Sequence, residues 1–372
     1  MREYESLGHM ELANDANPGA YYIPHHCVHS AGKFRVVFDA SMKTSNGLSL
    51  NSVLYTGPKL QANIVDILIR MRTYKIVLVA DITKMFRQIL IRPEDRKFQH
   101  ILWRENDNEP IKDYVLNTVT YGTGSSPFLA NRTIKQLGTD ERENYPDACE
   151  SIEDNIYVDD WIFGDESLSK LLPQRDQAIK LARSGGFELK KWSSNDPAAL
   201  EGIDCADLAI PLDFGQEPGD SHGVLGARWT PKGDVYSYKP LEFSTTLTKR
   251  AIVSNMSRIF DPLGWIAPCI LAIRIIVQKL WIAGVDWDEK IPTGIADYWL
   301  NLLSELPLLT SLKIPRLIIN TETKVITLIG FSDGSQSGYG ASIYVVTNFE
   351  GHFDSNLLMA KSKSFGKNEI SN

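Results

Sequence analysis

Three aspartates are the residues of this sequence best suited to chemistry. Asp159 and Asp160 are adjacent in YVDD (157–160), and Asp81 ends the apolar run IVLVAD (76–81). Crowded carboxylates repel one another and need a counter-charge. Mg²⁺ prefers such oxygen ligands, and two ions about 4 Å apart clamp the attacking and leaving oxygens of an in-line phosphoryl displacement. If the two segments are neighbours in one sheet, the sequence predicts a metal site for phosphoryl transfer.

Each aspartate also has a simpler interpretation. A pair of aspartates at a turn is most often a solvated loop, since Asp favours turns. Asp81 is placed to be the N-cap of a helix over ITKMFRQI (82–89). The metal-site interpretation therefore depends on both segments together with their neighbours.

Short strands and flanking helices would have to position the aspartates. The run 76–81 predicts a buried strand, and NIYVDDWIFG (155–164) predicts a hairpin with the two aspartates at its tip. Apolar spacing predicts a helix over 63–74, and another helix is expected to start near Pro127. Residues 1–20 are polar, so we expect a loosely ordered lead-in.

The remaining segments give a mixed pattern of helices and strands. We expect strands or hairpins over 33–41, 98–122, 187–194 and 222–240, helices over 167–186 and 292–306, and a mainly helical stretch over 245–287. Near residue 313 the character changes, because KVITLIGFSDGSQSGYGASIYVV (324–346) alternates with glycine turns. The pattern predicts an α+β chain with a β-rich unit at its end.

Composition limits the class of protein. The 372 residues are 43% hydrophobic and 23% charged, as in ordinary globular proteins. The net charge of −7 argues mildly against a protein that coats nucleic acid non-specifically, although a local basic groove can coexist with it.

Cysteine usage and apolar runs indicate the compartment. The four cysteines form no CxxC or Cys/His spacing and predict thiols in a reducing compartment: Cys27, Cys149, Cys205 and Cys269. The longest apolar stretch, 266–284, contains Arg274 and Lys279 and suits a core helix better than a membrane span. We expect an intracellular, cytoplasmic protein with no membrane partner.

The segments around the aspartates carry a family resemblance. YVDD resembles the catalytic hairpin of reverse transcriptases, VLVADITKMFRQI (77–89) their first aspartate motif, and YGTGSSPFLANRTI (121–134) their substrate-binding glycine–serine–proline motif. Further segments follow in the same order: YYIPHHCV, FRVVFDAS, GLSLNSVLYTGPKLQ, GFELKKWSSN and IFDPLGWIAPCIL. Together they resemble the BEL/Pao class of LTR retrotransposon polyproteins, from about residue 5 to the end.

The resemblance implies a fold and its divisions. It implies a right-hand polymerase of fingers, palm and thumb, followed by the first strands of an RNase H-like domain. The implied divisions are a lead-in over 1–20, fingers and palm over 21–235, a helical thumb or connection over 236–312, and a truncated RNase H-like segment over 313–372.

The resemblance also assigns roles at the catalytic motifs. Asp81, Asp159 and Asp160 match the family's metal-binding aspartates, and two Mg²⁺ ions, which Mn²⁺ can replace, are the implied cofactors. Phe86 matches the aromatic position under the sugar of the incoming nucleotide, where a ring leaves no room for a 2′-hydroxyl. A core aromatic is the alternative at Phe86.

Other matches concern the incoming nucleotide. Arg35 matches a fingers arginine that contacts the triphosphate, and a surface strand residue is its alternative. Tyr121 and Gly122 lie where the nucleotide packs, although retroviral enzymes place glutamine at the Tyr121 position. Lys191, or its neighbour Lys190, matches a lysine proposed to protonate pyrophosphate, with an exposed edge-strand lysine as the alternative.

Matches beyond the catalytic motifs concern the primer and the C-terminal segment. Leu225 and Gly226 match the tip of a primer-grip hairpin, or a plain β-turn. Three basic residues of the helical region would suit a phosphate backbone or be scattered surface charges: Lys249, Arg250 and Arg258. Asp333 in GFSDGSQSGYG matches the first metal ligand of RNase H. It lacks partner carboxylates, since Glu369 falls in a polar tail, so we expect no RNase H activity.

The expected function is that of an RNA-directed DNA polymerase core within a polyprotein fragment. The implied partners are an RNA or DNA template with a primer, and deoxynucleoside triphosphates. One alternative is a catalytically silent transposon relic that folds and binds nucleic acid without polymerising, favoured by the acidic net charge. A nuclease built around Asp333 is a weaker one.

Overall fold

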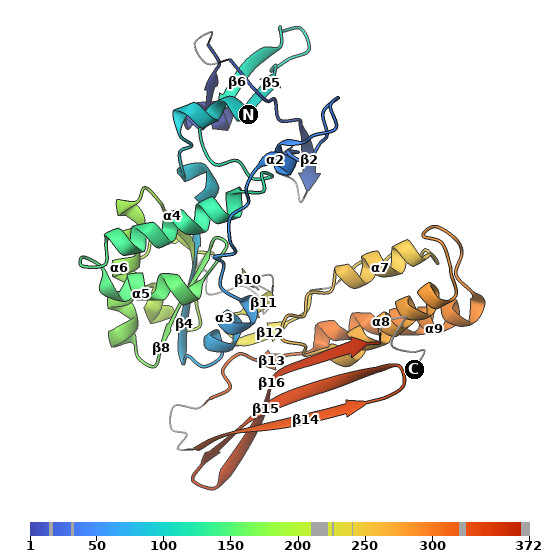
Figure 1. Cartoon of the computed structure of the whole chain (residues 1–372). Helices are drawn as coiled ribbons and strands as arrows, with labels where there is room; N and C mark the ends of the chain where they lie inside the picture. Colours follow the sequence, from blue (N-terminus) through green and yellow to red (C-terminus); the bar gives the residue numbers. More distant parts are fainter. Residues whose placement is uncertain are drawn as a thin grey trace. The chain divides into compact units, whose positions relative to one another are not determined.

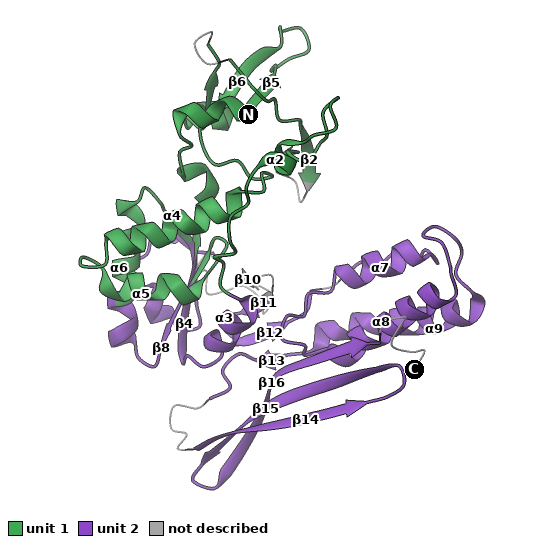
Figure 2. Cartoon of the chain, viewed as in Figure 1, with its two compact units in different colours: residues 1–62, 81–161, 174–190 green, residues 63–80, 162–173, 191–372 purple. Residues whose placement is uncertain are grey.

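The protein contains both helices and sheets (Figure 1). The computed structural model describes residues 1–14, 18–30, 33–209, 222–224, 227–239, 241–319 and 325–365. Two compact units are distinguished in Figure 2. Unit 1 consists of residues 1–62, 81–161 and 174–190, and unit 2 of residues 63–80, 162–173 and 191–372.

The N-terminal part of unit 1 is a three-stranded sheet in the order β1-β6-β5, with a short helix before it. Its elements are α1 (Arg2–Ser6), β1 (Met10–Leu12), β5 (His100–Trp103) and β6 (Lys112–Leu116). The expectation of a loosely ordered lead-in was wrong for residues 1–14. Tyr4 and Met10 are buried in one cluster with Phe38, and this burial holds α1 and β1 in place.

A second hairpin of unit 1 contains the predicted strand at 33–41. Strands β2 (His25–Ser30) and β3 (Lys33–Phe38) pair antiparallel, and Val28 lies opposite Arg35. The helix α2 (Leu50–Val53) follows, with Ser49 and Ser52 forming a capping box at its start.

A four-stranded sheet in the order β7-β8-β4-β9 contains the predicted apolar strand and the predicted hairpin. Its strands are β4 (Ile76–Ile82), β7 (Ile156–Tyr157), β8 (Asp160–Asp165) and β9 (Leu189–Ser194). The accompanying helices are α4 (Ser126–Asp140), α5 (Pro146–Asn155) and α6 (Leu168–Ser184). The helix expected to start near Pro127 is confirmed as α4, whereas α5 was not predicted.

Unit 2 holds a helical layer and a small sheet. The predicted helices are present as α3 (Ile64–Met71), α7 (Lys249–Ser257), α8 (Ala267–Ile282) and α9 (Thr293–Glu305). Buried residues of α7, α8 and α9 form one core that includes Ile252, Ile273 and Trp299. The small sheet has the order β10-β11-β12-β13: β10 (His222–Val224), β11 (Ala227–Thr230), β12 (Val235–Ser237) and β13 (Ile314–Pro315).

The last described segment is an antiparallel sheet, β14-β15-β16. The predicted hairpin is confirmed as β14 (Val325–Gly334) and β15 (Gly338–Phe349), and β16 (His352–Ser364) extends it against α8. Every residue of β14 is exposed.

Two buried arginines tie parts of unit 2 together. The Arg316 guanidinium forms a two-pronged ion pair with Asp234, at 2.6 and 2.7 Å, and donates to the carbonyls of Met71 and Tyr74. Arg72 donates to the carbonyls of Leu357 at 2.8 Å and Leu358 in β16. Burial lowers the pKa of Arg72 to about 10.

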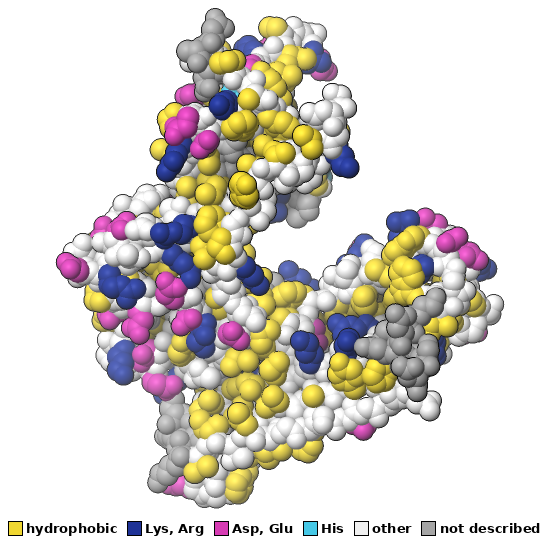
Figure 3. Space-filling model, in the orientation of Figure 1, with side chains coloured by type: hydrophobic (Ala, Val, Ile, Leu, Met, Phe, Trp, Pro, Cys, Tyr) yellow, Lys and Arg dark blue, Asp and Glu magenta, His cyan; other side chains and the backbone are white. Residues whose placement is uncertain are grey.

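Surface charges are mixed. On the face seen in Figure 3, Lys and Arg side chains are interspersed with Asp and Glu in both units. Within the described ranges, no helix has the length and apolar character needed to cross a membrane.

Candidate metal centre

The strand β4 carries Asp81 near its carboxyl end. Its residues from Ile76 to Ala80 are buried, and Asp81 is the partly buried exception. The alternative of a helix N-cap at Asp81 was wrong, because Asp81 lies inside the strand and the next helical turn, η1, covers Met85–Gln88. Asp81 is the penultimate residue of this apolar strand, so its carboxylate lies near one end of the sheet.

The hairpin β7–β8 carries Asp159 and Asp160. Pairing of Ile156 with Trp161 and of Tyr157 with Asp160 leaves Val158 and Asp159 as a two-residue turn. Such turns need positive φ angles, and Val158 has a φ of 56°. A β-branched residue at positive φ is a genuine outlier, so this turn is strained. The indole nitrogen of Trp161 donates to the Ser151 hydroxyl at 2.9 Å and anchors β8 on α5.

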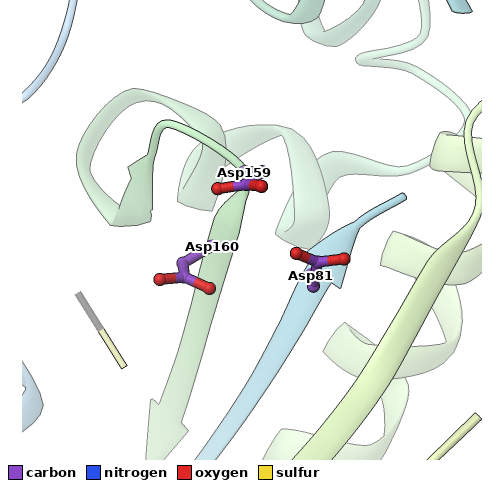
Figure 4. A group of neighbouring side chains, drawn as sticks. All are labelled: Asp81, Asp159 and Asp160. Atoms are coloured by element: carbon purple, nitrogen blue, oxygen red, sulfur yellow. The ribbon is translucent and has the colours of Figure 1, made fainter. Parts of the chain in front are cut away.

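The structure brings the three aspartates together. One carboxylate oxygen from each of Asp81, Asp159 and Asp160 lies within 4.8 Å of the others, and the three side chains are drawn in Figure 4. The amide of Ile82, next to Asp81, donates to the Asp159 carbonyl at 2.7 Å. This backbone contact explains why two segments far apart in sequence present their carboxylates at one place.

The donor set suits a hard divalent cation. Three carboxylates at such separations repel one another unless a cation or a proton compensates them. The ligands are all oxygen, without His or Cys, which fits Mg²⁺ or Mn²⁺ better than zinc or copper. Across the described part of the chain, this is the one group of three or more metal-ligating side chains.

A glutamine that sequence reasoning missed contacts the same turn. The side-chain amide of Gln61 donates to the Ile156 carbonyl at 2.8 Å and accepts from the Val158 amide at 2.9 Å. Gln61 ends the stretch GPKLQ, which belongs to the series of segments that carries the family resemblance. That place in the series of family-like segments is the only signal in the sequence that could have identified Gln61.

The predicted nucleotide-binding residues are dispersed over unit 1. Phe86 is half-buried in η1, five positions after Asp81, and Arg35 is exposed on β3. Gly122 has a φ of 99°, and a Cβ added there would lie 2.2 Å from the Phe38 carbonyl oxygen. The close backbone approach expected at Gly122 therefore occurs, but the neighbour is this chain's own β3.

Tyr121 is engaged inside unit 1. Its hydroxyl donates to the Val36 carbonyl at 2.9 Å and lies 2.7 Å from the Tyr4 hydroxyl. Burial, together with the hydrogen bond to Tyr121, raises the pKa of Tyr4. The Tyr121 ring also packs on Phe38 with 5.5 Å between centroids. The structure thus gives Tyr121 a packing role at the base of the β2–β3 hairpin.

The remaining predicted residues lie elsewhere or outside the described residues. Lys191 is exposed on β9 in unit 2 and has a φ of 53°. The Lys190 Nζ lies 3.5 Å from the Glu188 Oε2. The proposed primer-grip tip, Leu225 and Gly226, falls outside the described residues.

Asp333 is exposed on β14 and lines a cavity of about 560 Å³ beside the start of α8. Ala267 and Leu271 form the helix side of this cavity, and Lys361 of β16 lines it as well. Among the described residues, no second carboxylate lines this cavity. Glu369 lies outside the described residues.

The fold is similar to that of a retroviral polymerase. A solved structure of the foamy viral protease-reverse transcriptase in complex with double-stranded DNA matches with a TM-score of 0.58 and 15% identity. The match covers 99% of this chain and 55% of that chain, so this chain spans about half of that protein's length. The mixed α and β fold expected from the sequence is thereby confirmed, as a fold similar to that of a retroviral reverse transcriptase.

The particular family relationship comes from the C-terminal third. Residues 248–371 match the family described as the Pao retrotransposon-like RNaseH-like domain. For these residues, the match confirms the resemblance to Pao-class retrotransposons. It begins at α7 and therefore includes helices that the sequence assigned to a thumb or connection. No curated protein matches the chain.

Proposed function

We propose that this chain is the polymerase core of a retrotransposon reverse transcriptase, which adds deoxynucleotides to a primer 3′-hydroxyl. The observation that carries the proposal is the convergence of Asp81, Asp159 and Asp160 in a fold similar to a retroviral reverse transcriptase. The proposed partners are an RNA or DNA template with its primer, and deoxynucleoside triphosphates.

The aspartates have defined tasks in this proposal. Asp81 and Asp159 would hold two Mg²⁺ ions, or Mn²⁺ in their place, and Asp160 would add charge from the start of β8. When bound, such ions neutralise the charge that develops on the attacking and leaving oxygens of the nucleotide. The protein fixes where the reacting groups sit, because its carboxylates are presented from paired strands.

Other residues would select the incoming nucleotide and complete the reaction. Phe86 lies in the turn after Asp81, and its ring would exclude a 2′-hydroxyl from the sugar site. Arg35 and Gly122 would contact the triphosphate and the nucleotide, and Lys191 would protonate the leaving pyrophosphate. Tyr121 would support this site through its packing on Phe38.

We assign the fingers and palm to residues 21–235, the thumb or connection to 236–312 and an RNase H-like segment to 313–372. The β2–β3 hairpin supports the fingers assignment, and the α7–α9 core supports a helical thumb. Asp333 is the only acidic residue among those described around its cavity, so this proposal includes no RNase H activity.

Primer extension on an RNA template with Mg²⁺ tests the polymerase function. Asp159→Asn keeps the side-chain shape but removes the charge that binds the ions. We expect extension to fall on the order of a thousandfold, because metal stabilisation of the reacting oxygens contributes several kcal/mol. Asp165→Asn at the end of β8, outside the cluster, is the matched control and should retain activity.

Two results would contradict the proposal. Extension by Asp159→Asn at the parent rate would remove the carboxylate cluster from the mechanism. A folded parent chain that fails to extend any primer would instead favour the silent relic.

A further inference from the structure

We infer that Gln61 is a positioning residue of the metal centre: its side-chain amide holds the β7–β8 turn in the conformation that presents Asp159. The inference rests on the proposed function and adds a residue to it. It concerns the stretch GPKLQ, to which no role has been given.

The contact is a two-point clamp on the backbone of the turn. The Gln61 amide nitrogen donates to the Ile156 carbonyl at 2.8 Å, and its oxygen accepts from the Val158 amide at 2.9 Å. The clamp therefore spans Ile156, the first residue of β7, and Val158, the first residue of the turn. Both bonds have ordinary hydrogen-bond lengths.

The turn needs such support because of Val158. A valine with φ of 56° occupies a region that β-branched residues avoid, and a chain left to itself would relax toward negative φ. Relaxation there would swing the next residue, Asp159, out of place. The opposite side of the turn is already fixed, since Ile82 donates to the Asp159 carbonyl at 2.7 Å. Gln61 and Ile82 thus hold the turn from two directions.

Gln61 is itself held by the loop that carries it. Gly57, four residues earlier, has a φ of 73°, and a Cβ added there would lie 2.4 Å from the Phe128 ring of α4. This contact seats the loop on the helix that begins at Ser126. The residues of the clamp, its seat and the three aspartates all belong to unit 1.

Glutamine is the side chain that fits this task. Its amide is neutral and offers both a donor and an acceptor, so it satisfies a carbonyl and an amide together. A glutamate would lose the donor and add a further negative charge near three carboxylates. A methionine has similar length and can make neither bond, which makes it the informative substitution.

The test compares metal binding and kinetics in Gln61→Met. Mn²⁺ affinity of the purified chain without nucleotide, measured by electron paramagnetic resonance of free Mn²⁺, should fall about tenfold, the lower end of the usual effect of losing support around a metal ligand. In primer extension, kcat should fall by a similar factor, while KM for primer–template stays within about twofold.

A matched control separates positioning from general stability. Gln177 makes a comparable contact, since its side-chain oxygen accepts from the Asp147 amide at 3.0 Å at the start of α5. Gln177→Met should lower the melting temperature by an amount similar to Gln61→Met, yet leave Mn²⁺ affinity at the parent value.

A second variant tests whether the positive φ of Val158 is the reason that the turn needs Gln61. Glycine adopts positive φ readily, so Val158→Gly should make the clamp less necessary. In that background, Gln61→Met should reduce Mn²⁺ affinity by less than about twofold, which a double-mutant cycle measures as coupling between the two positions. Equal losses in both backgrounds would overturn the inference.

The outcomes also distinguish this inference from the proposed function. If Asp159→Asn weakens Mn²⁺ binding but folded Gln61→Met does not, the metal centre stands and the role of Gln61 is overturned. If Asp159→Asn binds Mn²⁺ as the parent does, the metal centre and the inference are overturned together.

Discussion

Val158 and Asp159 form the turn between β7 and β8, and this turn combines a strained backbone with a carboxylate of the candidate metal site. A positive φ at a β-branched residue costs about 1–3 kcal/mol and persists only where the surroundings hold it. Here the surroundings are Gln61 on one side and Ile82 on the other. The strained residue precedes a carboxylate of the cluster, which fits a turn selected for placing that carboxylate.

Gly122 gives a prediction at the same scale. In Gly122→Ala the new Cβ would meet the Phe38 carbonyl oxygen at 2.2 Å, a backbone atom that cannot move aside cheaply. Gly47→Ala is the matched control, because Gly47 also has positive φ, at 81°, but has nothing within 4 Å. We expect the Gly122 variant to lose about 1–3 kcal/mol more stability than the control in urea unfolding. Equal losses would show that backbone conformation alone requires this glycine.

The residue types of the site were predictable from local patterns, whereas their meeting was expected only through the family resemblance or on the condition that the two segments are neighbours in one sheet. The apolar run before Asp81 and the paired aspartates of YVDD identified the three carboxylates. Their proximity depends on the adjacency of β4 and β8, a non-local pairing that no local pattern encodes. The Gln61 clamp is non-local for the same reason, so its hydrogen bonds needed the structure.

At the level of elements, periodicity predicted the strands and helices with strong apolar patterns. Periodicity missed the elements whose apolar pattern is weak. The polar segment of α1 and β1 holds two buried apolar side chains, Tyr4 and Met10, too few for a recognisable pattern. The strand β16, HFDSNLLMAKSKS, mixes polar and apolar residues and gains its order from β15 and α8. Tertiary contacts, not propensity, decide such elements.

The ion pair between Arg316 and Asp234 gives a prediction at this scale. Arg316 is fully buried, directly follows β13 and donates to the carbonyls of Met71, the last residue of α3, and Tyr74. Arg316→Met removes the charged partner of Asp234 and the guanidinium donor to these carbonyls, and we expect a loss of about 3 kcal/mol. Fluorescence of buried Trp229, which donates to Asp234 at 3.1 Å, reports the unfolding of this region.

The exposed pair of Arg250 and Asp288 provides the comparison. It has similar geometry, at 2.7 and 2.8 Å, but lies in solvent. Arg250→Met should change stability little, because exposed ion pairs contribute little. If both variants were equally stable, burial of Arg316 would not matter to the fold.

At the scale of the whole molecule, metal binding and stability are linked. A ligand that binds only the folded state stabilises it by RT ln(1 + [L]/Kd), about 1.4 kcal/mol at tenfold excess over Kd. We therefore expect Mg²⁺ or Mn²⁺ to raise the melting temperature by a few degrees in the parent and not in Asp159→Asn. Scanning calorimetry against an EDTA-treated sample measures the difference. An identical rise in the variant would place the bound ion outside the aspartate cluster.

The most direct test of the central claim is the anomalous diffraction of crystals grown with Mn²⁺. We predict manganese within about 2.2 Å of carboxylate oxygens from both Asp81 and Asp159. Anomalous density confined to other parts of the chain, with the three carboxylates left bare, would contradict the metal centre and the polymerase proposal built on it.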